Sequence, residues 1–551
     1  MKKFLFLVII SLLVYSCARV GSPIGGAKDS IPPKMLSSNI DTTRVNVPTT
    51  TKELRIDFDE YIKLKEINKN LIISPPITKI KKILPANLGT KFLLIQWEDT
   101  LKANTTYNFN FGNAITDLNE ANTLPYFNFA FSTGSEIEDY YISGELTDAL
   151  GEKKADGKDV NYVVGLYQVK DSMDYRQKPY YITNVDPDGY FELNYLSPGK
   201  YKILAFEDQN QNSIFDNGKE KFAFSKDDIT IEDKTNISGM KLKLFPSVPK
   251  VKYKEYKPTQ GGLVLLYEGK PDKVEVTSTS ENLKDFIVTH RPKSDSVFVW
   301  FDAVSQNIGI EKSDNIKLAA KTTVKSDSIS AYYKYDPKVE MTLGSIGDKV
   351  VAPNNPYKVR ANFPISEMVT DNWVLTSDSI SQSFTAKVSK TNIYDLEINS
   401  DFKAGKTYQL SIPKETVKSY YKSIDKSYRM DFEIGKPENY GSLKLALSNV
   451  PQHYFWIQML GDKNEIQYQQ YTRDQQITFK NLKPGNYKLR ILLDNNDDGY
   501  WELGSFDEGR YAEDAFLFRK GKDTNPMTTV NIRPMWEINE KWDLNSEIQN
   551  N

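Results

Sequence analysis

Cysteine is nearly absent from this sequence. Of 551 residues only Cys17 carries a thiol, so no internal disulfide can form and a cysteine-based metal site is excluded. Histidine is almost as scarce, with His290 and His453 alone. Neither belongs to an H-E-x-x-H motif, and no G-x-S-x-G or G-x-x-x-x-G-K-[S/T] motif occurs. We therefore expect no catalytic residues and no enzymatic activity.

The chain also lacks a charge of one sign and lacks long apolar runs. Its 71 basic and 73 acidic residues leave a net charge of −2. The chain therefore lacks the excess of positive charge that is typical of proteins that bind nucleic acid. After the N-terminus no segment is apolar enough to span a membrane. Aromatic residues, in contrast, make up 12% of the chain and include 33 tyrosines. Aromatic and β-branched residues favour strands over helices.

The N-terminus is typical of an exported lipoprotein. Lys2 and Lys3 precede an apolar run from Phe4 to Tyr15, which is shorter than the about 20 residues of a spanning helix. A basic start and a short apolar run indicate a signal peptide, here residues 1–16. A small residue then precedes Cys17 in V-Y-S-C, as in a bacterial lipobox. We predict a lipid such as palmitate on Cys17; the alternative is an ordinary secretory signal with a chance cysteine.

The remaining chain alternates in short runs separated by turns. Residues 17–31 are rich in Gly, Ser and Pro and predict a flexible tether. From residue 32 onward, period-two runs such as LRIDFDEYI and YFNFAFS predict strands. Residues 281–288 could form one short helical turn, and the proline-containing run 245–258 predicts an extended linker. The expected fold class is therefore all-β.

Two stretches of sequence each occur twice, in the same order. LKANTTY around Tyr107 corresponds to FKAGKTY around Tyr408, and Phe131 and Phe432 follow these tyrosines at equal spacing. More weakly, Phe58 corresponds to Phe363. Beyond each copy lies a second repeat: LSPGKYKILAFEDQNQNSIFDNG at 196–218 and LKPGNYKLRILLDNNDDGYWELG at 482–504 align without a gap. The chain therefore contains a duplicated pair of modules, A–B, on either side of a middle segment X.

This pattern gives a domain map in the order A–B–X–A–B. We predict domains at residues 32–135 (A), 136–246 (B), 247–338 (X), 339–436 (A) and 437–546 (B), with a tail at 547–551. Module A resembles the SbsA-like bacterial Ig-like domain of Bacteroidota lipoproteins through IDFDEYIKLKEINKNLIISPP, LKANTTYNFNFGNAITDLNEAN and FNFAFSTG. Module B resembles transthyretin-like or carboxypeptidase-regulatory-like β-sandwiches through L-x-P-G-x-Y. The middle segment is expected to be Ig-like by its pattern.

The resemblance implies tandem β-sandwiches in an outer-membrane lipoprotein, but it implies no activity. In some Bacteroidota lipoproteins acidic residues after the cysteine direct export to the cell surface. Here Ala18 and Arg19 stand at those positions. The sequence therefore leaves open whether the protein faces the cell surface or the periplasm.

An acidic loop ends each copy of module B and has the ligand spacing of a calcium site. Oxygen ligands at alternate positions, with a glycine at the sharp turn, are typical of calcium loops. The second copy offers Asp494, Asn496, Asp498, the Tyr500 carbonyl and Glu502. The first copy offers Asp208, Asn210, Asn212, the Ile214 carbonyl and Asp216.

The same loops have a second interpretation. The twelfth position, which should be a bidentate glutamate, is Lys219 or Ser505, so Glu220 or Glu508 would have to reach in. Asp and Asn also form Asx-turns with their own backbone, and such turns need no ion. Calcium is thus the only cofactor that the sequence suggests, and Asx-turns remain the alternative.

Two function classes follow from these observations. The first is a non-enzymatic, lipid-anchored scaffold, an accessory subunit of an outer-membrane complex of secretion, uptake or barrel-assembly type. Its partners would be the membrane, through the lipid, and outer-membrane β-barrel or other envelope proteins. The second is a surface carbohydrate-binding or adhesion protein, for which Tyr500 and Trp501 beside the acidic loop are the best binding candidates. Five sandwiches in tandem would form an extended rod.

Overall fold

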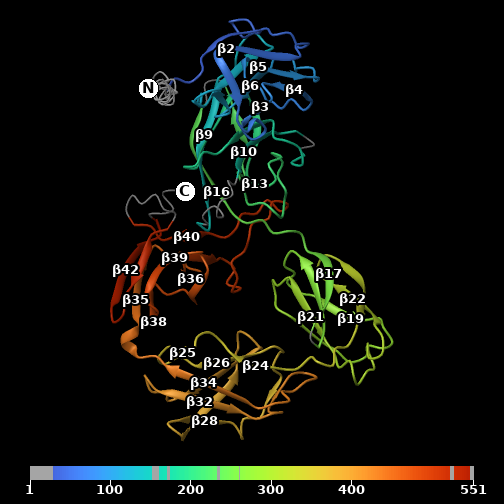
Figure 1. Ribbon diagram of the computed structural model, residues 1–551, viewed down its shortest axis with the longest axis vertical. Helices are drawn as coiled ribbons and strands as arrows, with labels where there is room; N and C mark the ends of the chain where they lie inside the picture. Colours follow the sequence, from blue (N-terminus) through green and yellow to red (C-terminus); the bar gives the residue numbers. More distant parts are fainter. Residues whose placement is uncertain are drawn as a thin grey trace, which may run out of the picture.

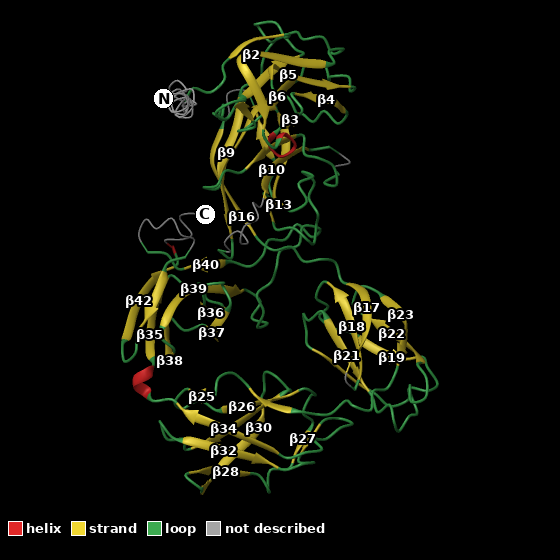
Figure 2. Cartoon of the chain, in the orientation of Figure 1, coloured by secondary structure: helices red, strands yellow, loops and turns green. Residues whose placement is uncertain are grey.

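The computed structural model describes residues 29–151, 161–170, 174–232, 236–259, 261–520 and 527–545. Within these ranges the fold is all-β, which confirms the expected class, and the strands gather in five regions that each bury a hydrophobic core (Figures 1 and 2). No helix in these ranges is long and apolar enough to cross a membrane. Cys17, the signal peptide, most of the predicted tether and the predicted tail lie outside the described residues.

The first Ig-like domain consists of two facing sheets. One has the order β1-β2-β5-β4 with β7 paired to β2, and the other has the order β3-β6-β8. Its elements are β1 (Met35–Ser38), β2 (Glu53–Leu64), α2 (Ile67–Asn70), β3 (Ile72–Ser74), β4 (Ile80–Leu84), β5 (Thr90–Trp97), β6 (Thr106–Asn110), β7 (Ile115–Asp117) and β8 (Asn128–Ser132). Alternate residues of β2, such as Leu54, Ile56 and Phe58, are buried between the sheets, as the period-two pattern predicts.

The first copy of module B, called the first transthyretin-like domain after its sequence resemblance, has the sheets β11-β10-β13-β14, with β15 on β13, and β12-β9-β16. Its strands are β9 (Tyr140–Asp148), β10 (Asn161–Gln168), β11 (Tyr181–Asn184), β12 (Tyr190–Leu196), β13 (Gly199–Asp208), β14 (Phe222–Phe224), β15 (Ile229–Ile231) and β16 (Ile237–Leu244).

The middle domain pairs the sheet β17-β18-β21-β20 with β19-β22-β23. Its strands are β17 (Lys252–Thr259), β18 (Gly262–Glu268), β19 (Glu275–Ser278), β20 (Ile287–His290), β21 (Ser296–Trp300), β22 (Asp314–Lys321) and β23 (Ser326–Tyr333).

The second Ig-like domain has the sheets β24-β26-β31-β30, β25-β34-β32-β28-β29 and β27-β33. Its strands are β24 (Leu343–Ser345), β25 (Val350–Val351), β26 (Tyr357–Ala361), β27 (Glu367–Met368), β28 (Val374–Ser377), β29 (Ile380–Gln382), β30 (Phe384–Val388), β31 (Asp395–Ser400), β32 (Thr407–Ile412), β33 (Val417–Lys418) and β34 (Tyr428–Ile434).

The second transthyretin-like domain follows the short 3-10 helix η1 (Pro437–Asn439). Its sheets are β37-β36-β39-β40, with β41 on β39, and β38-β35-β42. Its strands are β35 (Gly441–Ser448), β36 (Tyr454–Leu460), β37 (Ile466–Thr472), β38 (Gln476–Leu482), β39 (Gly485–Asp494), β40 (Ala515–Leu517), β41 (Thr529–Ile532) and β42 (Glu537–Asp543).

The duplication is visible in topology and in single contacts. The two transthyretin-like domains share one strand order, including a parallel pair, β9 with β16 and β35 with β42. In the Ig-like domains Tyr107 stacks on Phe131 at 5.8 Å and Tyr408 stacks on Phe432 at 5.6 Å between ring centroids. Each tyrosine hydroxyl also accepts a backbone N–H from five residues upstream, at 2.9 and 2.8 Å. Equal sequence spacing therefore produces equal packing.

Two local expectations were wrong. Residues 281–286 form bends rather than a helical turn, and β20 begins at Ile287, because this segment connects two strands and its β-branched end pairs with β21. The predicted linker 245–258 is shorter than expected, since residues from Lys252 onward form β17. Pro258 is tolerated there because β17 is an edge strand that pairs only with β18.

The chain does not form the extended rod expected of tandem sandwiches. In Figure 1 the last domain, drawn in orange and red, returns to the lower end of the first transthyretin-like domain. Backbone and side-chain contacts join these two domains: Ser247 forms an isolated β-bridge with Gly504, and the Asn464 side-chain amide donates to the Gly151 carbonyl at 3.4 Å. The four domains after the first one therefore form a closed ring.

Candidate functional site

The first acidic loop lies at the end of β13, against the first transthyretin-like core. Asp208 is only 1% exposed, and its carboxylate accepts the backbone N–H groups of Asn212 and Ser213 at 3.0 and 2.9 Å. The Asn212 side chain accepts the Ile214 N–H at 2.6 Å. The Asn210 amide donates to Asp216 at 2.8 Å. The predicted ligand residues therefore converge, and Asx-type hydrogen bonds hold the loop.

A glutamate that lies just outside the positions assigned by the calcium-loop spacing completes this loop. Glu220 is 1% exposed and its two oxygens accept the N–H groups of Gln209 and Asp216 at 3.0 and 2.8 Å. Burial raises the pKa of Glu220, and the neighbouring Asp208 and Asp216 raise it further. A positive charge placed among these carboxylates would therefore be favoured.

The second loop repeats this geometry at the end of β39. Asp494 is fully buried and accepts the N–H of Asp498 at 3.1 Å and that of Gly499 at 2.6 Å. The place of Glu220 is taken by Glu513, which accepts the N–H groups of Asn495 and Glu502 at 2.6 and 2.7 Å.

Sequence spacing did not identify Glu513. In the first copy one residue, Lys219, separates Gly218 from Glu220, whereas residues 505–512 separate Gly504 from Glu513 in the second. Glu508, the candidate from spacing, instead pairs with Arg510 at 3.2 Å. The insertion 505–512 is thus the main difference between the two loops.

A lysine from the middle domain forms ion pairs with two carboxylates of the second loop. The Lys293 ammonium lies 2.6 Å from Asp498 and 3.1 Å from Glu502, and it sits 5.0 Å from the centre of the Tyr500 ring. Lys293 belongs to the turn between β20 and β21. The predicted ligand side chains of this loop are therefore already paired with a positive charge. The same ion pairs join the middle domain to the last one.

The Lys293 contact should respond to pH. Burial raises the pKa of the Asp498 carboxyl, but the hydrogen bond from Lys293 acts together with weaker hydrogen bonds and the lysine charge to hold this pKa below its ordinary value. Burial likewise opposes the hydrogen bonds to Asp498 and Glu502, which raise the pKa of Lys293. The lowered carboxyl pKa contributes its full stabilisation above about 3.9 and loses it as pH falls through the folded-state pKa of Asp498, whereas the raised ammonium pKa contributes its full stabilisation below about 10.4 and loses it as pH rises through the folded-state pKa of Lys293. We expect the contact to persist between these values and to open in acid.

Small-angle X-ray scattering measures this opening as an increase in the radius of gyration below about pH 4. The variant Lys293→Met keeps the side-chain stem and removes the charge, so its scattering should lose the acid step. An unchanged acid step in Lys293→Met would assign the transition to other carboxylates.

Calcium fits the first loop better than the second. Among the residues that the structure describes, no three His, Cys, Asp or Glu side chains converge as metal ligands. An ion at Asp208 would therefore depend on the amide oxygens of Asn210 and Asn212 and on the Ile214 carbonyl, all of them hard oxygen donors. In the second loop an ion would have to displace Lys293. Calcium binding stays a prediction, and it concerns the first loop.

Chelation provides the thermal test of that prediction. We expect EDTA to lower the melting temperature and added Ca²⁺ to restore it, because an ion at 100 times its Kd stabilises by about 2.7 kcal/mol. Asp208→Asn removes a ligand charge and should abolish this response. A melting temperature that EDTA leaves unchanged would support the Asx-turn interpretation.

Tyr500 and Trp501, the predicted binding pair, lie against other domains. Tyr500 is 37% exposed, and Lys293 covers its ring. The Trp501 indole N–H donates to the Glu513 carbonyl at 2.8 Å, and its ring packs against a small cluster that contains Leu150 of the first transthyretin-like domain with Leu492 and Ala515 of the last domain. The pair therefore contributes to domain contacts and offers little free ring surface.

An aromatic contact closes the ring of domains. Phe506, from the insertion 505–512, inserts its ring between aromatic side chains of the first transthyretin-like domain. Its ring centroid lies 4.7 Å from that of Tyr175, 5.1 Å from Phe215, 5.7 Å from Phe222 and 6.2 Å from Phe224. We call this contact the clasp.

Tyr511, from the same insertion, adds polar bonds to the clasp. Its hydroxyl donates to the Phe224 carbonyl and accepts the Lys226 N–H, both at 3.0 Å. Gly504 explains the close approach at the base of the insertion, because a Cβ there would lie 1.9 Å from the Phe245 ring. The insertion 505–512, which only the second repeat contains, is thus the element that joins the two transthyretin-like domains.

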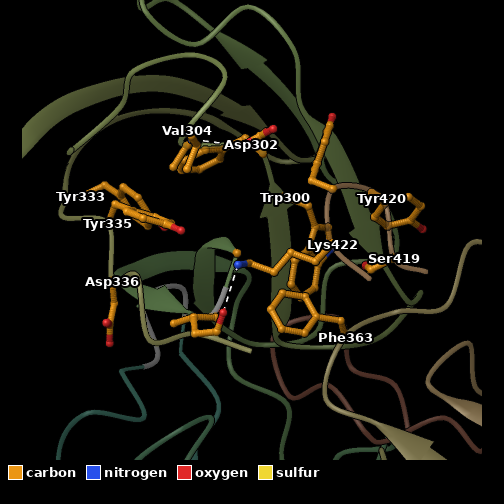
Figure 3. A pocket seen from close by; sticks show the side chains of 15 residues that line it. Trp300, Asp302, Val304, Tyr333, Tyr335, Asp336, Phe363, Ser419, Tyr420 and Lys422 are labelled. Carbon is orange, nitrogen blue, oxygen red and sulfur yellow. Dashed lines mark hydrogen bonds between the residues drawn. The ribbon is translucent and has the colours of Figure 1, made fainter. Parts of the chain in front are cut away.

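A cavity of about 140 Å³ lies between the middle domain and the second Ig-like domain (Figure 3). Trp300, Tyr335, Phe363 and Tyr420 line it. In Figure 3 the Tyr335 ring and the Lys422 side chain reach toward each other across it.

The two histidines take no part in a catalytic arrangement. The His290 ring N–H donates to the Ser294 carbonyl at 3.2 Å. His453 lies 3.9 Å from Asp497 of the second acidic loop. Neither ring contacts a serine hydroxyl or a second imidazole in any hydrogen bond of the described residues.

Comparison with known proteins identifies the class of the first domain. Residues 29–133 match the family described as bacterial Ig-like domain, which confirms that part of the resemblance. No curated protein matches the chain. The lipoprotein part of the resemblance is a prediction from the N-terminal residues.

Solved structures of other multidomain proteins are distantly similar. The S-layer protein rSbsC(31-844) is 13% identical over 90% of this chain and 67% of that chain, with a TM-score of 0.15. The major pilin subunit BcpA of Bacillus cereus is 8% identical over 74% and 99%, with a TM-score of 0.13. The Bacillus anthracis TIE protein is 9% identical over 94% and 75%, also at 0.13. Function is therefore argued from the residues of this chain.

Proposed function

We propose that the protein is a non-enzymatic scaffold, anchored in the outer membrane by lipid on Cys17, which serves as an accessory subunit of an outer-membrane complex. The observation that carries this proposal is the clasp. A closed ring of four domains holds its outer surfaces in fixed relative positions, because each domain is joined to at least two others. Such a body suits simultaneous contact with several partners better than a flexible string of domains.

The expected partners are outer-membrane β-barrel or other envelope proteins. Exposed apolar side chains that could serve such contacts occur on several domains, including Leu88, Val324, Ile380 and Trp536, which are between 57% and 82% exposed. These four residues belong to four different domains, so they indicate no single patch. The partner surface is therefore left to experiment.

Affinity purification in mild detergent tests the scaffold proposal. The membrane-bound chain should recover a β-barrel protein in stoichiometric amount, identified by mass spectrometry. Cys17→Ala should release the chain from the membrane fraction. Phe506→Ala, which opens the ring, should reduce partner recovery while lipidation is retained. A chain that purifies alone in every case would overturn the proposal.

The face of the membrane needs a separate measurement. Protease added to intact cells cleaves a surface-exposed protein and spares a periplasmic one. The alternative function, adhesion through Tyr500 and Trp501, is not favoured, because both rings lie in contacts with other domains.

A further inference from the structure

The cavity between the middle domain and the second Ig-like domain has the size of one six-membered ring. Its volume is about 140 Å³, close to the about 150 Å³ of an engineered apolar cavity that holds benzene. Val304, 58% exposed, lies at its margin, so the cavity is open to solvent on that side. Ligand sites commonly occur at such junctions between domains.

Aromatic rings from both domains form its walls. Trp300, at the end of β21, and Phe363, after β26, are both buried and lie 5.9 Å apart between ring centroids. The Trp300 indole N–H is already bonded to the Thr289 hydroxyl at 2.8 Å, which fixes the orientation of the ring. Tyr335 and Tyr420 add two half-buried phenol rings. Trp300 and Phe363 are 3% and 2% exposed and offer a ligand little ring surface. The half-buried rings of Tyr335 and Tyr420 therefore supply the aromatic surface that the C–H groups of a flat, ring-shaped ligand can contact.

Phe363 has a different packing partner from its counterpart in the first copy of the Ig-like domain. Its counterpart in the first Ig-like domain, Phe58, packs against Phe127 of the same domain at 6.0 Å. Phe363 instead meets Trp300 of the neighbouring domain. A position that is internal in one copy therefore lines a junction cavity in the other.

Donors and acceptors are both present at this cavity. The Lys422 ammonium donates to the Val339 carbonyl at 3.0 Å and retains two further N–H donors. The Asp302 carboxylate accepts the N–H groups of Val304 and Ser305 at 3.0 and 3.2 Å and retains acceptor capacity. Asp336 supplies a second carboxylate on the lining. Hydroxyl groups, which both donate and accept, complement such a mixture.

The charged side chains at this cavity disfavour anionic ligands and purely apolar ligands. Two carboxylates against one ammonium disfavour an anion. A purely apolar ring would displace water from Lys422 and Asp302 without replacing its hydrogen bonds, which costs free energy. A neutral polyhydroxylated ring satisfies both the aromatic walls and the polar groups.

We infer that this cavity binds one pyranose residue of a neutral glycan, held against the rings of Tyr335 and Tyr420 and hydrogen-bonded by Lys422 and Asp302. This binding goes beyond the scaffold function and does not depend on it, since it needs neither the lipid anchor nor an envelope partner. The bound sugar would also join two domains and so stabilise their junction.

Titration with methyl glycosides of glucose, galactose, mannose and N-acetylglucosamine tests the inference on the full soluble chain. Saturation-transfer NMR detects contact with the sugar ring, and tryptophan fluorescence gives the Kd. At least one glycoside should bind, with a Kd of about 1 mM or tighter. The melting temperature should rise at saturating glycoside.

Matched variants localise the binding. Tyr335→Ala removes a cavity wall and should weaken binding at least about tenfold. Lys422→Met keeps the stem and removes the donor, with a loss of similar size. Tyr332→Ala is the control, because Tyr332 is 59% exposed on the adjoining strand and does not line the cavity. Melting curves verify that each variant folds.

Three results would overturn the inference. Absence of binding by all four glycosides would remove the sugar assignment. Equal binding by Tyr335→Ala, Lys422→Met and the unaltered chain would place the sugar elsewhere. Indole or toluene binding in preference to the glycosides would assign the cavity to an apolar ligand.

Discussion

Phe506→Ala is expected to open the ring of domains. The Phe506 ring contacts four aromatic rings of the first transthyretin-like domain, and removal of a buried phenylalanine ring costs about 3–5 kcal/mol. Phe506 is half-buried, so we expect the lower end of that range or slightly less. Because the loss falls on a contact between domains, each domain should stay folded while the contact breaks.

Small-angle scattering and limited proteolysis report on this change. The radius of gyration should increase, and a protease should cut within 505–512 faster than in the unaltered chain. Tyr126→Ala is the matched control, since Tyr126 is an aromatic residue that is 74% exposed in the first domain. A Phe506→Ala variant with the scattering profile of the unaltered chain would show that other contacts suffice to close the ring.

Asp494→Ala is expected to destabilise the second transthyretin-like domain. The Asp494 carboxylate is fully buried and accepts the Tyr471 hydroxyl at 2.6 Å as well as two backbone N–H groups. Alanine leaves these three donors without a partner, and each buried unsatisfied donor costs about 1–3 kcal/mol. We expect a loss of about 3 kcal/mol or more, since some donors will find water.

Denaturant unfolding measures this loss as a lower midpoint at an unchanged slope. Asp494→Asn keeps one carbonyl acceptor in place and should lose less. Asp462→Ala serves as the control, because Asp462 is exposed in the same domain. Equal midpoints for Asp494→Ala and Asp462→Ala would contradict the structural role of the buried carboxylate.

The fold was predictable because its signals are local. Alternation in segments such as LRIDFDEYI reports directly which side chains face a core, and Leu54, Ile56 and Phe58 are buried as expected. The repeats added topology, since equal spacing of Tyr107 to Phe131 and Tyr408 to Phe432 requires equal strand pairing. Both kinds of information lie within a single domain.

The contacts between domains were not predictable, because they join residues that are far apart in the sequence. Lys293 and Asp498 meet only after three domains have taken their places, and no pattern in the sequence links them. Phe506 lies in the largely polar insertion 505–512, and nothing in its sequence neighbours distinguishes it from an exposed side chain. Glu513 was missed because an insertion moved it away from the position that the calcium spacing assigns.

Ring closure connects any pair of the four domains in at least two ways, one along the covalent chain and one through contacts between domains, of which the clasp is the main one for the first and last domains of the ring. A single cut in the segment between β16 and β17 would interrupt only the covalent route. The two fragments would stay in register and comigrate under native conditions, and they would separate only when the clasp was also broken. A protein exposed to proteases would in this way tolerate one cut without losing its shape.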